Sequence, residues 1–108
     1  MTAPPLNALE PLWAELWISL ASLLRSYTAV HGLGGNLQAQ IEQDEERIMA
    51  RHGARWMELK RRGATVSWKR ENGNCGTLEL TEAGRLLSST GEEEMDLAAE
   101  GWARELMQ

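Results

Sequence analysis

A stripe of large apolar side chains at helical spacing is the feature that most constrains how this chain folds. Its steps along the chain alternate between four and three residues, through Leu9, Trp13, Leu16, Leu20, Leu23, Tyr27 and Val30. Such steps keep side chains on one face of an α-helix, so the spacing predicts a long helix over residues 6–31. The run GLGG at 32–35 predicts its end, because glycine readily adopts the left-handed conformation that terminates helices.

This helix carries more apolar surface than one neighbouring element can cover. Four further apolar residues, among them Trp17, lie off the stripe, and the polar strip that remains is narrow. The helix is therefore either central to the core or one half of a homodimer interface. The residues predicted for self-association are Leu9, Trp13, Leu16, Trp17, Leu20, Leu23 and Tyr27.

A second long helix is predicted over residues 37–62, with Asn36 as its N-cap. Its apolar positions are sparser, which predicts one narrow buried face and a solvated remainder. Acidic residues come early in this segment and basic residues late, an order that suits the helix dipole. Gly53 lies within the segment, so one bent helix and two abutting helices are both compatible with the sequence.

The apolar periodicity then changes to two, which predicts a β-hairpin with strands at about 64–70 and 76–81. The segment between them is rich in residues that form turns. The apolar side chains of both strands face the core together when Trp68 lies opposite Leu78, and this register requires an odd-numbered loop.

Two helices are predicted after the hairpin. Thr81 caps a short helix at 82–88, and a capping box that begins at Thr90 starts a last helix at about 91–107. The fold predicted from the sequence is thus an α+β domain with two long N-terminal helices, one β-hairpin, a short helix and a C-terminal helix. This single domain is expected over residues 6–108, after a disordered lead-in at 1–5.

Charge is segregated along the chain. Residues 47–70 contain eight bases and one acid, whereas the rest of the chain holds three bases and fifteen acids, and the net charge is −5. Clustered cations repel one another unless negative charge lies opposite, and that charge could come from the chain's own acids, an acidic protein or nucleic acid. The candidate partner-binding residues are Arg47, Arg51, Arg55, Lys60, Arg61, Arg62, Lys69 and Arg70.

The sequence MELKRRGATVSWKRENGNCGTLELTEAGRLL at 57–87 resembles the end of a winged-helix domain, in which a helix leads into a β-hairpin wing and the chain returns to a helix. The resemblance implies a DNA-binding regulator in which residues 54–62 enter a groove and Lys69 and Arg70 lie on the wing. Upstream the pattern departs from the family, because only Gly53 is a candidate for the compact turn before the recognition helix. The implied DNA contacts are Arg51, Arg55, Lys60, Arg61, Arg62, Lys69 and Arg70.

Catalytic and metal-binding motifs find little support in the sequence. His31 and His52 do not stand at a motif spacing from a nucleophile or a carboxylate, and one cysteine with two distant histidines offers no ligand spacing for a metal. The sequence therefore predicts no enzyme, no cofactor and no metal. Cys75 is the single cysteine, so an intramolecular disulfide is excluded and a reducing compartment is expected.

Membrane insertion is not expected, because the most apolar run, LWISLASLL at 16–24, is nine residues long and a spanning helix needs about 20. The function predicted from the sequence is a small, non-enzymatic, cytoplasmic binding module. It is expected to self-associate through its tryptophan-rich first helix and to present a basic patch to an acidic partner. A DNA-binding transcriptional regulator is the alternative.

Overall fold

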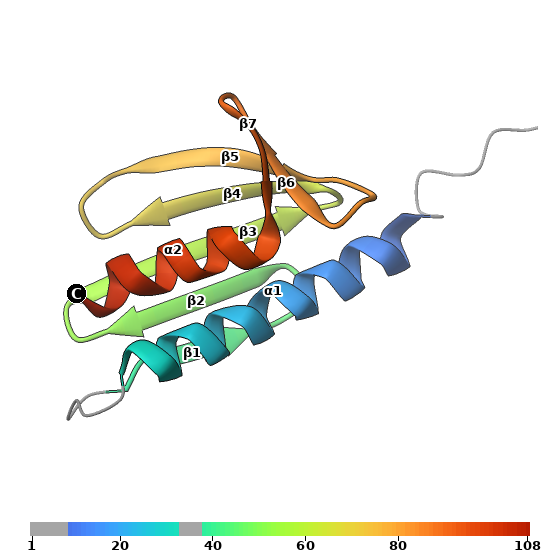
Figure 1. The fold of residues 1–108 in the computed structure, drawn as a ribbon. Helices are drawn as coiled ribbons and strands as arrows, with labels where there is room; N and C mark the ends of the chain where they lie inside the picture. Colours follow the sequence, from blue (N-terminus) through green and yellow to red (C-terminus); the bar gives the residue numbers. More distant parts are fainter. Residues whose placement is uncertain (1–8, 33–37) are drawn as a thin grey trace, which may run out of the picture.

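The computed structural model describes residues 9–32 and 38–108, which form one helix, then a seven-stranded sheet and then a second helix along the chain (Figure 1). Residues 1–5, predicted as a disordered lead-in, and Asn36, predicted as an N-cap, lie outside the described residues. The elements are α1 (Glu10–His31), β1 (Gln40–Gln43), β2 (Arg47–His52), β3 (Arg55–Arg62), β4 (Thr65–Arg70), β5 (Cys75–Leu80), β6 (Arg85–Ser88), β7 (Gly91–Glu94) and α2 (Met95–Met107).

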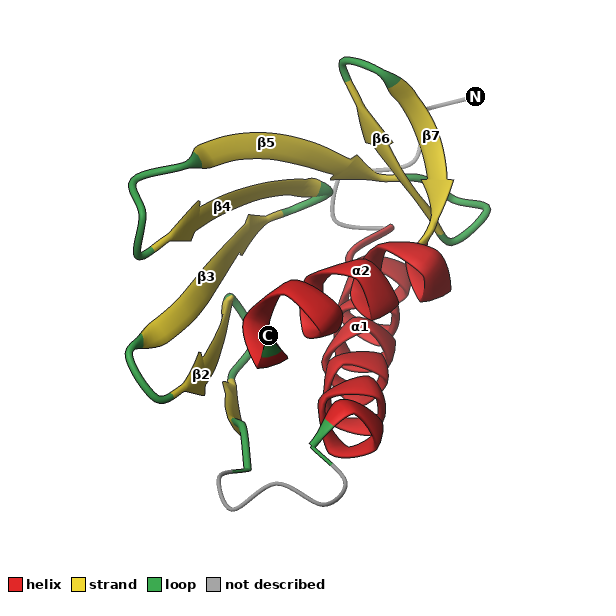
Figure 2. Ribbon diagram, turned by 60° about the vertical axis from the view of Figure 1, so that its left-hand side comes forward, coloured by secondary structure: helices red, strands yellow, loops and turns green. Residues whose placement is uncertain are grey.

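The sheet is an antiparallel meander, in which each strand pairs with the next one along the chain. Paired residues of antiparallel strands share one face of the sheet, and successive residues alternate between the two faces. Both helices lie on the same side, and the sheet bends around them (Figure 2). We call this side the helix face, where Ile48 pairs with Leu59, and the other side the open face, where Arg47 pairs with Lys60.

The core lies between the helix face and the two helices. Trp17, Leu20, Ala21 and Leu24 of α1 are buried there, so most of the apolar surface of this helix is covered within the chain. The indole Nε1–H of Trp17 also donates a hydrogen bond to the Asp44 carbonyl, 3.0 Å away, and ties α1 to the turn after β1. The remaining core residues are Ile48, Met57, Leu59, Val66, Leu80, Leu86, Met95, Ala98 and Ala99.

The second long helix predicted over 37–62 is wrong, because this segment forms β1, β2 and β3. The burial pattern of β3 shows the period of two that defines a strand: Met57, Leu59 and Arg61 are buried, whereas the residues that alternate with them are more exposed. Arg47, Arg51 and Arg55 stand four residues apart, as on one face of a helix, but this spacing does not coincide with the pattern of burial.

Two glycines set the turns that make these strands possible. Gly53 and Gly63 each begin a two-residue turn and have φ angles of 61° and 60°. Alanine follows each glycine, and no non-glycine residue of the described chain has a positive φ. This combination is the II′ hairpin turn, which has glycine at its first central position and twists as the flanking strands do. Gly53 therefore turns the chain between two strands and does not break a helix.

The predicted hairpin is present as β4 and β5, but its register differs by two residues from the prediction. Val66 lies opposite Leu78, and Trp68 lies opposite Gly76. A Cβ atom on Gly76 would stand 2.8 Å from the Trp68 ring, so the absence of a side chain there makes room for the indole. The apolar side chains still share one face, because a shift of two preserves the alternation.

The short helix predicted at 82–88 is also wrong. A turn at Thr81–Gly84 leads into strand β6, and Leu86 of that strand is buried in the core. The last helix begins at Met95 and not at residue 91, because β7 occupies the four residues before it. In the described part of the chain, no helix combines the length and the hydropathy needed to cross a bilayer.

Candidate functional site

Strand alternation divides the eight candidate partner-binding residues between the two faces of the sheet. The cross-strand pairs place Arg55, Arg61 and Arg70 on the helix face, in line with the buried residues Met57, Leu59 and Val66. The other five candidates lie on the open face. These open-face bases are Arg47, Arg51, Lys60, Arg62 and Lys69.

Arg61 is a buried structural residue, with 6% of its surface exposed. Its guanidinium donates hydrogen bonds to the carbonyl of Glu45 from Nη2 (2.9 Å) and Nε (3.2 Å), to the carbonyl of Gly63 (3.1 Å) and to the carboxylate of Glu10 (2.7 Å). It also lies 5.9 Å from the Trp17 ring centroid. These contacts join α1 to two turns of the sheet, so Arg61 has little capacity left for a partner.

Arg55 and Arg70 contact the C-terminal end of α2. Arg55 donates a hydrogen bond of 2.7 Å to the carbonyl of Glu105, and Arg70 forms an ion pair with the Glu105 carboxylate. The Nδ1 atom of His52 lies 3.3 Å from the carbonyl of Leu106. The guanidinium groups of Arg55 and Arg70 interact favourably with the dipole and the unpaired carbonyls at this helix C-terminus, so these contacts hold α2 on the sheet.

Two of the open-face bases share the carboxylate of Glu58. The Nε of Arg47 lies 2.6 Å from one Glu58 oxygen, and the Nζ of Lys60 lies 3.9 Å from the other. The hydrogen bond from Arg47 lowers the pKa of the Glu58 carboxyl below its ordinary value, against the opposing effect of burial, and the charges of Arg47, Lys60 and Lys69 lower it further. Glu58 is therefore ionised at neutral pH and offsets one positive charge of the open face.

Arg51, Arg62 and Lys69 make no ion pair with any residue in the described ranges. All three are exposed on the open face. Their charges are therefore not neutralised by direct contacts of the described chain, although the chain as a whole is acidic.

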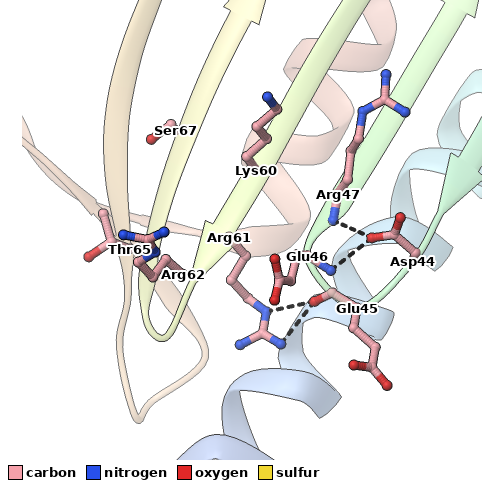
Figure 3. A pocket seen from close by; sticks show the side chains of 9 residues that line it. All are labelled: Asp44, Glu45, Glu46, Arg47, Lys60, Arg61, Arg62, Thr65 and Ser67. Atoms are coloured by element: carbon pink, nitrogen blue, oxygen red, sulfur yellow. Dashed lines mark hydrogen bonds between the residues drawn. The ribbon is translucent and has the colours of Figure 1, made fainter.

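A hollow of about 1030 Å³ lies at the end of the sheet where the turns after β1 and β3 meet (Figure 3). Bases line the side formed by β3, and acids line the side formed by the turn after β1. The Asp44 carboxylate is held within the turn, because one of its oxygens accepts hydrogen bonds from the backbone N–H groups of Glu46 (2.9 Å) and Arg47 (2.8 Å). The lining residues are Asp44, Glu45, Glu46, Arg47, Lys60, Arg61, Arg62, Thr65 and Ser67.

The residues predicted for self-association are mostly used inside the chain. Trp17 and Leu20 have exposed fractions of 1% and 0%, so neither is available to a second copy. Trp13, Leu16, Leu23 and Tyr27 are partly buried against the core, and the Tyr27 hydroxyl donates a hydrogen bond to Asp96 of α2. Leu9 is 40% exposed. The dimer itself stays a prediction that the single chain does not test.

Sequence reasoning missed the hydroxyl groups that lie beside the bases. Thr65 pairs with Arg62 and Ser67 pairs with Lys60, so each hydroxyl is a direct cross-strand neighbour of a cation. The sequence feature that could have predicted these pairs is the two Gly-Ala dipeptides, which stand ten residues apart. They fix both turns and therefore the register of the strands.

Within the described ranges, no three His, Cys, Asp or Glu side chains are grouped as metal ligands. His31 lies 3.3 Å from Glu100 on the helix side, and Cys75 is exposed on β5. No family model, curated protein or solved structure matches this chain.

Proposed function

We propose that this chain is a non-enzymatic binding module that docks an acidic segment of a partner protein on the open face of its sheet. The observation that supports this proposal is the exposure of Arg51, Arg62 and Lys69 without an ion pair to the described residues. In a chain of net charge −5, three such cations on one surface attract negative charge from a partner.

The pattern of charge favours an acidic protein over nucleic acid. Glu42, Glu58 and Glu79 lie on the same face as the bases and interrupt them. A nucleic-acid backbone presents phosphates at regular intervals. Wherever it lies across this face, some of its phosphates therefore come close to these carboxylates and are repelled. An acidic peptide can instead place its carboxylates only where the bases are. The winged-helix resemblance gives no support to the alternative, because residues 54–62 form strand β3 and its preceding turn, and not a helix that could enter a groove.

Charge reversal at the three cations tests the proposal. The probe is a fluorescein-labelled peptide of ten alternating Glu and Gly residues, titrated at low and at near-physiological salt and followed by fluorescence anisotropy. We expect the wild-type protein to bind the peptide with an affinity that falls as salt is added. The variant Arg51→Glu, Arg62→Glu, Lys69→Glu is expected to bind at least tenfold more weakly.

The chain offers a control of the same net charge. Arg25, Arg85 and Arg104 are the three bases outside residues 47–70, so reversing them changes the total charge by the same amount. This control is expected to keep most of the affinity for the peptide. Equal losses in the two variants would contradict the proposal, because they would assign the effect to net charge alone. Tight binding of a DNA duplex without binding of the peptide would favour the nucleic-acid alternative.

A further inference from the structure

Strands β3 and β4 bring two cations and two hydroxyls together on the open face. The register pairs Lys60 with Ser67 and Arg62 with Thr65, so the four side chains occupy the corners of one cross-strand rectangle. Directly paired residues on one face have Cβ atoms about 4.5–5.5 Å apart, and residues two apart along a strand are separated by about 7 Å. In Figure 3 the Arg62 guanidinium lies beside Thr65, and all four side chains line the same hollow.

The donors of this rectangle are available. All four residues are exposed. Arg62 forms no ion pair with a described residue, and the contact of Lys60 with Glu58 is long, at 3.9 Å. The hydroxyls that form hydrogen bonds in the described chain are those of Tyr27, Thr28, Ser88 and Thr90, with Thr81 accepting one, and neither Thr65 nor Ser67 is among them.

We propose that Lys60, Arg62, Thr65 and Ser67 form a binding site for a phosphate monoester carried by the partner protein, such as a phosphorylated serine. This inference rests on the proposed function, because it names the group that the partner presents at one place on the open face. A phosphate monoester carries a charge of about −1.5 to −2 at neutral pH and has three acceptor oxygens. Two cations and two hydroxyls at the corners of one cross-strand rectangle provide donors for all three oxygens of such a group, whereas a carboxylate offers two coplanar oxygens.

The acidic side of the hollow limits the ligand to one carrying an isolated phosphate. Glu45 and Glu46 line the same hollow as the four donors, on the turn after β1. A polyphosphate or a nucleic-acid backbone that filled the hollow would place further negative charge against these carboxylates. A peptide with a single phosphate can leave that side to a neutral or basic residue.

Two matched peptides test the site. The first is the labelled Glu-Gly peptide with a phosphoserine at its centre, and the second has glutamate at that position. We expect the wild-type protein to bind the phosphorylated peptide at least tenfold more tightly. The variant Thr65→Val, Ser67→Ala, which changes no charge, is expected to lose most of this preference while it retains its affinity for the glutamate peptide. The variant Ser22→Ala, Ser26→Ala, which removes two exposed hydroxyls of α1, is the control and is expected to keep the preference.

The outcomes separate the two proposals. If neither peptide binds, the proposed function fails. If both bind with equal affinity, or if the preference survives in the Thr65→Val, Ser67→Ala variant, the phosphate site is overturned and the docking face stands. Circular dichroism of each variant shows whether the sheet is intact, and Thr65→Val retains a β-branched residue in the strand so that the fold is preserved.

Discussion

Arg61 is the residue whose role differs most from what its sequence neighbourhood predicted. It stands between Lys60 and Arg62 in a run of three bases, yet its side chain is buried and its neighbours are exposed. A strand places consecutive side chains on opposite faces, so three adjacent cations cannot serve one surface. From its buried position the guanidinium donates hydrogen bonds to the carbonyls of Glu45 and Gly63, which belong to two different turns.

Removal of the Arg61 guanidinium therefore destabilises the fold. We expect Arg61→Met to lower the free energy of unfolding by about 2–3 kcal/mol, because the hydrogen bonds of a charged group to Glu10, Glu45 and Gly63 are lost together. The adjacent Arg62→Met is the control and is expected to change it by less than about 0.5 kcal/mol. Urea denaturation of the two variants measures both values. Equal and small effects would contradict the structural role of Arg61.

Glu58 predicts a dependence of stability on pH. Its pKa is lowered in the folded protein, chiefly by the hydrogen bond from Arg47, relative to the ordinary value of 4.5. A carboxyl with a lower pKa in the folded state stabilises the fold above its unfolded pKa and loses that contribution as the pH falls through the folded pKa. We expect the free energy of unfolding to fall more steeply between about pH 5 and pH 3 in the wild-type protein than in Glu58→Gln. Parallel curves from denaturation at each pH would contradict this assignment.

At the scale of elements, the sequence predicted a helix or strand correctly where the apolar residues followed a single periodicity. The first helix, the hairpin of β4 and β5 and most of the last helix had apolar spacings that match one kind of element. Residues 40–62 contain arginines at helical spacing. They also contain apolar residues that alternate as in a strand, but Met49 and Arg61, both buried, break this alternation. A polar residue in a buried position and an apolar one on the open face obscured the period of two.

The turn glycines give a test at the same scale. Gly53 has a φ of 61°, and a Cβ atom there meets nothing within 4 Å, so a substitution is penalised by backbone conformation and not by a clash. We expect Gly53→Ala to destabilise the protein by about 1–2 kcal/mol. Gly101 lies inside α2, where Gly101→Ala is expected to stabilise by about 0.5–1 kcal/mol. Thermal denaturation in which Gly53→Ala is as stable as the wild-type protein would argue against the turn geometry.

At the scale of the whole molecule, one side of the sheet provides the core and the other provides the candidate site. This division explains why the sequence predicted a basic patch but could not show which of the eight bases belong to it. Arg55 and Arg70 hold the end of α2, whereas Arg51 and Lys69 face away from it, and only the strand register separates the two pairs. The number of charges in a segment does not reveal the strand register, so it cannot show which bases share a face.

The core between the helices and the sheet predicts a large cost for truncation of α1. Leu20 is fully buried at the centre of the helix. We expect Leu20→Ala to lower the free energy of unfolding by about 2–5 kcal/mol, from lost burial and the cavity left behind. Ile18→Ala, at a position 55% exposed on the same helix, is the control and is expected to cost far less. A similar cost at both positions, measured by urea denaturation, would contradict the packing of α1 on the sheet.

Docking of an acidic segment on the open face is tested most directly by mapping backbone amide chemical shifts during titration with the unphosphorylated Glu-Gly peptide. We expect the largest changes on β2, β3 and β4, at and beside Arg51, Arg62 and Lys69, and we expect them to diminish as salt is added. Changes confined to α1 and α2, or no saturable changes at low salt, would contradict docking on the open face.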